Sequence, residues 1–196
     1  MKFLRKRSGD LEAYLELTYE NRSQRDQARE LLVHLQYGFC AYSERYLKPL
    51  DSVEVEHFDP RKKNSDGDSI ANWHAVLRWM NAHKARKIEP FLPLPELAEL
   101  EVDRFTYERG EFICAEGDIE AINLLEFLGV NRPEVFEERA KHVKRVRRMR
   151  ELCKTEEEFR TFLIDVSPDD LSFPTALEAE LGIPAFEWIL EANAAS

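Results

Sequence analysis

The segment VEVEHFDPRKKN, residues 53 to 64, constrains the fold of this chain most. Its first residues alternate between apolar and acidic side chains, which is the period of a strand with one buried face. The alternation ends at Glu56 and His57, and Pro60 then turns the chain into three basic residues. The segment therefore predicts a strand that brings an acid and an imidazole to its end.

The composition predicts a soluble, single-domain protein around this strand. The chain has 196 residues, of which 43% are hydrophobic and 34% charged, enough for one domain with its own core. No apolar run reaches the length of a membrane span, and MKFLRKRSGD lacks the apolar region of a secretion signal. The three cysteines form no CxxC pair, which favours a reducing compartment. We therefore expect a cytoplasmic location and no membrane partner.

The net charge of −10 argues against strong autonomous binding to nucleic acid. The basic side chains are unevenly placed, however, with clusters at residues 2–7, 61–63, 84–87 and 141–150. A local basic groove is therefore compatible with the acidic total.

The periodicity predicts an α+β fold that is mostly helical. One helix is expected from Ser8 to about residue 20, and a second, with a capping box at Ser23 and Asp26, runs to Gly38. An irregular hairpin over 39–47 and 52–58 and a helix from Trp73 to Lys87 follow. A second hairpin is expected over 104–115, and the remaining helices begin at Asp118, Pro133, Thr155, Ser167-Pro168 and Pro184. The predicted divisions are N-terminal helices over 1–38, a strand–strand–helix core over 39–87, and a hairpin with a helical region over 88–196.

A histidine at the end of a strand in such a core suggests phosphodiester hydrolysis. This reaction needs a general base for water and a divalent cation for the charge on the phosphate. A neutral His57 imidazole suits the first role near pH 7. The oxygen atoms of Glu56 and of an asparagine suit Mg²⁺ or Mn²⁺.

Two asparagines are placed for this site. Asn81 lies nine residues after Asn72, so on one helix the two side chains would point in opposite directions. The two side chains can reach one site only if Asn72 lies in the loop before the helix. There its amide would fix the loop that carries His57. Lys84, one turn beyond Asn81, is then expected to meet a phosphate.

Each of these residues also has an ordinary structural interpretation. Alone, Glu56-His57 is typical of a surface strand end, Asn72 of a helix cap and Asn81 of a solvated helix position. His74 and His83 are typical of surface or partly packed histidines, and the basic runs of solvated faces. The functional hypothesis therefore depends on the order of the pieces along the chain.

In that order the residues resemble the HNH, or ββα-metal, endonuclease family. The segments that carry the resemblance are CAYSE (40–44), VEHFDP (55–60), NW (72–73) and LRWMNAHK (77–84). The resemblance is closest to the HNH subunits of Septu and retron antiphage systems. It continues through TYERGEFI (106–113) and AINLLEFLGVNRPEVFEERAKHV (121–143), and so covers about residues 25 to 150.

The resemblance implies a ββα-metal core between the N-terminal helices and the C-terminal helical region, with a role for each site residue. His57 would be the general base, and Asn72 the residue that orients its loop. Glu56 and Asn81 would hold Mg²⁺ or Mn²⁺, with Asn81 counted also among the catalytic residues. Apart from the resemblance, we expect Arg61, Lys62, Lys63 and Lys84 to guide the substrate backbone, and His83 is close enough in sequence to serve as an auxiliary.

The sequence departs from the family at its structural zinc site. The four positions that carry zinc-binding cysteines fall at Cys40, Ser43, Leu77 and Met80, so we expect no structural zinc. Two of the replacements are apolar, and we expect them to pack the hairpin onto the helix where the metal did so.

The function that follows is a metal-dependent DNA endonuclease in an antiphage complex, with an ABC-type ATPase as partner. Two alternatives stay open. The chain is either a non-catalytic interaction subunit of the same fold, suggested by the zinc loss and the acidic charge, or a nuclease that cuts RNA, because the site chemistry does not select the sugar.

Overall fold

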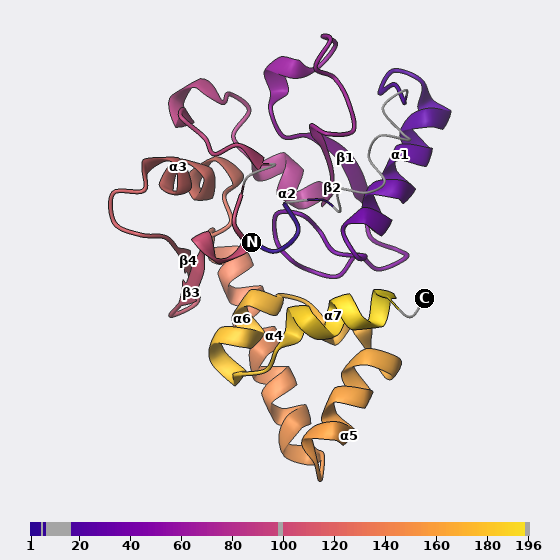
Figure 1. The fold of residues 1–196 in the computed structure, drawn as a ribbon, viewed down its shortest axis with the longest axis vertical. Coiled ribbons are helices and arrows are strands. Elements are labelled where there is room, and N and C mark those ends of the chain that lie inside the picture. Colours follow the sequence, from indigo (N-terminus) through magenta and orange to yellow (C-terminus); the bar gives the residue numbers. More distant parts are fainter. Residues whose placement is uncertain (5, 7–16, 98–99, 195–196) are drawn as a thin grey trace.

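The computed structural model describes residues 1–4, 6, 17–97 and 100–194 (Figure 1). The chain is an α+β protein, about 51% helical, with two small antiparallel sheets in this described part. The helices are α1 (Arg22–Leu35), α2 (Arg78–His83), α3 (Ile119–Leu128), α4 (Pro133–Leu152), α5 (Glu156–Thr161), α6 (Pro174–Leu181) and α7 (Ala185–Ala194). The strands are β1 (Val53–His57), β2 (Trp73–Leu77), β3 (Thr106–Glu108) and β4 (Glu111–Ile113). Within these ranges, no helix combines the length and the apolar character needed to cross a membrane.

The strand predicted from VEVEH is present as β1, but its predicted partner is wrong. β1 pairs antiparallel with β2, so that His57 lies opposite Trp73 and Val53 opposite Leu77. The segment expected to pair with β1, residues 39–47, makes only an isolated bridge between Phe39 and Tyr46. The pairing partner is instead supplied after a long loop, which local patterning does not indicate.

The helix predicted from Trp73 to Lys87 is therefore also wrong over its first half. Trp73–Leu77 is a strand, and α2 covers only Arg78–His83. All five residues of β2 are buried, so the apolar run has no polar face to show a strand period. The order along the chain is still strand, strand, helix, and Figure 1 shows the strand pair lying between α1 and α2.

The N-terminal prediction is partly correct. The helix expected from Ser8 lies mostly outside the described residues, and residues 17–20 are not helical. The second helix, α1, is present with Ala28, Leu32 and Leu35 buried. Its cap is not the predicted Ser23, because the side chain of Asn21 accepts the N–H groups of Ser23 and Gln24.

Several predictions in the second half of the chain are confirmed. β3 and β4 form the expected hairpin, and α3 begins after Asp118, whose side chain accepts the Ala121 N–H. α3 ends at Gly129 in the left-handed conformation, and α4 begins at Pro133 as predicted. Thr155 caps α5 through the Glu158 N–H. The helix α6 was not predicted.

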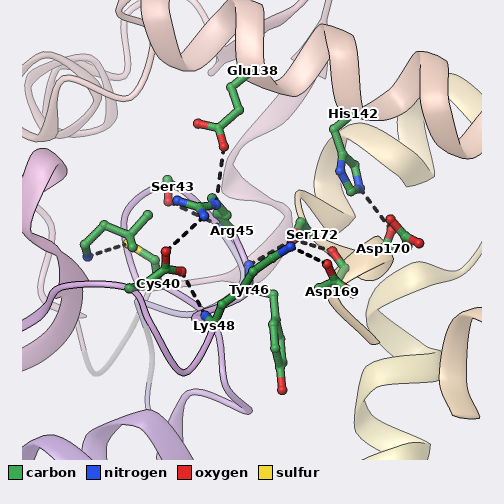
Figure 2. Close-up of polar contacts among 12 residues, drawn as sticks. Cys40, Ser43, Arg45, Tyr46, Lys48, Glu138, His142, Asp169, Asp170 and Ser172 are labelled. Atoms are coloured by element: carbon green, nitrogen blue, oxygen red, sulfur yellow. Dashed lines mark hydrogen bonds and ion pairs between the residues drawn. The ribbon is translucent and has the colours of Figure 1, made fainter. Parts of the chain in front are cut away.

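Two hydrophobic clusters make up the core. The first surrounds β1, β2, α1 and α3, and the second lies among α4 to α7, which form the lower part of Figure 1. The segment 40–48 connects them. Figure 2 shows its polar contacts with the C-terminal region: Arg45 with Glu138 at 3.3 Å, Lys48 with Asp169 at 2.6 Å, and the Tyr46 N–H with Ser172 Oγ at 2.9 Å.

Candidate functional site

The end of β1 presents Glu56 and His57 to opposite faces of the strand, as the alternation of a strand requires. Both side chains are buried, with 8% of Glu56 and 6% of His57 exposed. The two side chains therefore have different partners, although both lie at the same end of the strand.

On its face, His57 is held by an acid from the loop between the strands. Asp68 Oδ1 lies 2.8 Å from His57 Nε2 and also accepts the Trp73 indole N–H at 2.6 Å. The second oxygen, Asp68 Oδ2, accepts the Asn64 N–H at 2.7 Å. Because a carboxylate only accepts hydrogen bonds, this contact places the imidazole proton on Nε2. Nδ1 has no hydrogen-bond partner among the described residues and is the basic nitrogen of the neutral ring.

The surroundings of His57 favour its neutral form. Burial lowers the pKa of His57, and the contact with Asp68 opposes this shift by favouring the charged ring. The ring also meets Tyr19 edge-on, with the ring centres 4.4 Å apart. Burial thus favours the neutral imidazole, and the orientation of the ring is set by Asp68 and by the rings of Tyr19 and Trp73.

Asn72 fixes the turn that follows His57. Its Nδ2 donates to the Asp59 carbonyl at 3.0 Å, and its Oδ1 accepts the Asp59 N–H at 2.9 Å. The Asn72 carbonyl also accepts the Phe58 N–H at 2.8 Å. Asn72 precedes a strand, so its interpretation as a helix cap is wrong, and the loop contact expected of it is present.

On the opposite face, Glu56 is enclosed by two donors. Its Oε1 lies 2.6 Å from Lys84 Nζ, and its Oε2 accepts the Tyr42 hydroxyl at 3.0 Å. Lys84 Nζ also donates to the carbonyls of His57 at 2.7 Å and Phe58 at 3.1 Å. Only 6% of Lys84 is exposed. The expected contact of Lys84 with a phosphate is therefore not available in this arrangement.

Burial also sets the protonation of this pair. Desolvation raises the pKa of Glu56 and lowers the pKa of Lys84, and in each case the partner's charge acts in the opposite direction. Removing either member would leave the other charge buried with hydrogen bonds only to neutral groups.

Asn81 is not in contact with Glu56. Its Nδ2 donates to Glu54 Oε2 at 2.7 Å, and the other oxygen of Glu54 lies 3.6 Å from Arg78 Nε. The metal site expected from Glu56 and Asn81 is thus not assembled here. In the part of the chain that the structure describes, no group of three or more His, Cys, Asp or Glu side chains is placed to hold a metal ion.

The chemistry around Lys84 nevertheless suits a cation. Its ammonium is surrounded by a carboxylate oxygen and two carbonyl oxygens, which are the hard ligands that Mg²⁺ and Mn²⁺ prefer. A divalent ion bound to these oxygens would take the place of the Lys84 ammonium.

The remaining predicted residues lie on the surface around the loop. Arg61 forms a two-pronged ion pair with Asp59, while Lys62 and Lys63 are exposed. Lys63 Nζ lies 5.1 Å from the centre of the Tyr19 ring. His83 is exposed, stacks on Trp79 and contacts the Trp79 carbonyl rather than His57.

The four positions at which the resemblance predicted zinc cysteines, and where this chain has Cys40, Ser43, Leu77 and Met80, lie close together. The Leu77 N–H donates to Cys40 Sγ at 3.4 Å, and a cavity is lined by Ser43, Leu77 and Met80. Cys40, Leu77 and Met80 are buried, as apolar packing of the turn onto the start of α2 requires.

Sequence reasoning missed three residues of this site. Asp68, Tyr42 and Tyr19 all reach β1 from segments that are remote in sequence or from loops. The only local signal was an acid in the loop 64–69, which is too common to indicate a histidine partner. In comparisons with known proteins, no family model, no curated protein and no solved structure matches the chain.

Proposed function

We propose that this chain is a metal-dependent endonuclease of the HNH type that cleaves DNA. The observation that carries the proposal is the arrangement at the end of β1. Asp68 holds His57 through Nε2, Nδ1 has no hydrogen-bond partner among the described residues, and Asn72 fixes the turn beside the ring. These elements follow one another as strand, strand and helix, the order expected from the resemblance.

In the proposed reaction, His57 Nδ1 accepts a proton from the water that attacks the phosphorus atom. Asp68 keeps the other ring nitrogen protonated and stabilises the imidazolium that forms. Asn72 holds the backbone beside the base. A divalent cation, when bound, supplies stabilisation of the negative charge on the phosphate and the leaving oxygen. Glu56 and Asn81 would hold this cation, with the Lys84 ammonium displaced from Glu56 and the Asn81 amide released from Glu54.

The biological setting is part of the same proposal and rests on the resemblance alone. The chain would be the nuclease subunit of a Septu-like or retron-like defence complex, with an ABC-type ATPase as partner. The net charge of −10 favours a partner that helps to load the substrate, because a strongly acidic chain repels free nucleic acid.

Cleavage of supercoiled plasmid tests the nuclease proposal. The wild type is expected to give nicked or linear DNA with Mn²⁺ or Mg²⁺ and none with EDTA. His57→Ala is expected to lose activity by at least about 100-fold, the contribution of a general base. The matched control is His34→Ala, because His34 is an exposed histidine on α1. Cleavage by His57→Ala at the wild-type rate would show that the assignment of the base is wrong.

A second candidate function is favoured by the closed state of Glu56. The contacts with Lys84 and Tyr42 satisfy this carboxylate without a metal, as expected of a non-catalytic interaction subunit. Titration with Mn²⁺ separates the two functions. Binding that is lost in Glu56→Gln supports the nuclease, and no binding by the wild type supports the interaction subunit. RNA offered beside DNA in the cleavage assay identifies the substrate.

A further inference from the structure

A cavity of about 500 Å³ lies beside β1, on the side of α1. Three arginines of α1, Arg22, Arg25 and Arg29, line it together with Tyr19 and the side chains of Glu54 and Asn81. The arginines recur at a spacing of three and four residues, so they share one face of the helix. None of them was singled out by the sequence patterns.

The charges in this cavity are not all neutralised internally. Arg29 pairs with Asp26 at 3.0 Å, and Glu54 is engaged by Arg78 and Asn81. Within the described ranges, Arg22 and Arg25 have no carboxylate partner. Two guanidinium groups therefore line a hollow on an acidic protein, and the described residues supply neither with a carboxylate counter-ion.

Tyr19 connects the cavity to His57. The centre of its ring lies 4.4 Å from that of His57, and the Arg25 guanidinium carbon is 5.2 Å from the ring centre. Lys63 approaches the same ring at 5.1 Å. Lys63, Tyr19 and Arg25 thus form a chain of contacts that adjoins His57 and ends at the arginines of α1.

We infer that this surface, defined by Arg22, Arg25, Tyr19 and Lys63, binds the phosphodiester backbone of a nucleic acid. Guanidinium groups bind phosphate through paired hydrogen bonds, and an aromatic ring between cations offers a stacking surface for a base. The inference rests on the proposed nuclease function, because it assigns the substrate backbone to the surface that adjoins His57. It also replaces Lys84, whose ammonium is buried, as the principal backbone contact.

Fluorescence anisotropy of labelled DNA and RNA strands, in EDTA so that nothing is cut, tests the inference. The double variant Arg22→Gln/Arg25→Gln is expected to weaken binding severalfold. The slope of log K against log salt concentration is expected to be shallower than that of the wild type by about 1.4 to 1.8. This difference is the contribution of two phosphate contacts. Parallel DNA and RNA arms show which sugar the surface accepts.

Two further variants make the outcome decisive. Arg22→Lys/Arg25→Lys retains both charges and is expected to keep the slope. Lys144→Gln/Arg148→Gln removes two exposed charges from α4 and is the charge-matched control. The inference is overturned if the wild type binds no nucleic acid, or if the α1 variant loses no more binding than the α4 control.

The test is independent of the nuclease proposal. Binding that depends on the arginines, without any metal-dependent cleavage, would support the nucleic-acid-binding surface and count against the nuclease function. Cleavage that depends on His57, together with binding that is unchanged by the Arg22 and Arg25 substitutions, would support the nuclease and overturn the assignment of this surface.

Discussion

At the scale of single residues, Asp68 decides which nitrogen of His57 accepts a proton. Its carboxylate contacts Nε2, so the free lone pair is on Nδ1. Asp68 also raises the pKa of His57 against the lowering effect of burial. The same carboxylate is held in place by the Trp73 indole and by the backbone of Asn64, so its position does not depend on His57 alone.

Asp68→Asn is therefore expected to lower the pKa of His57. An amide oxygen still accepts the Nε2 proton, but the negative charge that favours the imidazolium is lost. The acid limb of the pH–rate profile for cleavage is expected to move to lower pH, because His57 then loses its proton at a lower pH. The rate on the plateau is expected to fall, since the base is weaker.

An NMR titration of the His57 ring measures the same shift without any cleavage. The matched control is Asp66→Asn, because Asp66 is an exposed acid in the same loop. An unchanged His57 pKa in Asp68→Asn would show that Asp68 is not the residue that positions and polarises His57.

The residue scale is also where the sequence was least informative. The pairing of Glu56 with Lys84 joins residues 28 positions apart, through a lysine that the pattern placed on the surface. Lys84 directly follows α2, and its ammonium contacts Glu56 and the carbonyls of His57 and Phe58. These partners are remote in sequence, so no local pattern indicated that this lysine is buried.

At the scale of elements, capping and turn residues predicted the ends of helices better than hydrophobic periodicity predicted the type of element. The caps at Asp118 and Thr155, the Gly129 end of α3 and the Pro133 start of α4 are all short-range interactions, and they are present. The strand β2 could not be distinguished from a helix, because a fully buried strand has no alternation. Its pairing with β1 spans a long loop, and only the packed chain selects it.

The junction between the segment 40–48 and α2 offers a test of the resemblance at this scale. The triple variant Ser43→Cys/Leu77→Cys/Met80→Cys is expected to bind one Zn²⁺ through four thiolates with Cys40. The Leu77 N–H contacts Cys40 Sγ, and Ser43, Leu77 and Met80 line one cavity, so the four thiolates are expected to reach one ion. The apo form is expected to be less stable by several kcal/mol, since two buried apolar side chains are truncated.

Replacement of Zn²⁺ by Co²⁺ provides the readout, because tetrahedral thiolate coordination gives strong visible absorption. The thermal midpoint of unfolding is expected to rise on adding Zn²⁺. The control is Ser43→Cys alone, which supplies only two thiols. A folded triple variant that binds no metal would count against the resemblance in this region.

At the scale of the whole molecule, the two hydrophobic clusters are joined by a buried acid. Glu44 is fully buried, and its carboxylate accepts the Lys2 N–H at 2.7 Å and the Thr175 hydroxyl at 2.9 Å. Its carbonyl accepts the Phe173 N–H at 2.7 Å. With the contacts of Arg45 and Lys48 in Figure 2, these hydrogen bonds tie the strand pair to the C-terminal helices. The composition predicted one domain, but this connection was not visible in any local pattern.

Three buried histidines make the stability of the whole chain depend on pH. Burial lowers the pKa of His57 and His142 and lowers that of His74 most strongly, where the charges of Lys6 and Lys84 act in the same direction. His74 is fully buried, with Nε2 against the Leu4 carbonyl at 2.9 Å and Nδ1 unpaired. The folded chain thus has no ready acceptor for a proton on this ring.

The sign of the effect follows from proton binding. Below about pH 6.5, the usual pKa of a histidine, the unfolded chain takes up protons that these folded rings do not bind. The unfolded state therefore binds more protons, so the free energy of unfolding falls as the pH falls through this window. Each histidine contributes at most about 1.4 kcal/mol per pH unit.

His74→Gln is expected to remove one of these contributions. At about pH 8 all three histidines are neutral in both states, so the variant differs from the wild type only by the altered packing and hydrogen bond. As the pH falls to about 5, the wild type loses stability through His74 and the variant does not, so the gap between their free energies of unfolding narrows. Urea unfolding at a series of pH values measures both curves. Parallel curves would show that His74 takes up its proton equally in the folded and unfolded chain, and that acid unfolding of this protein begins elsewhere.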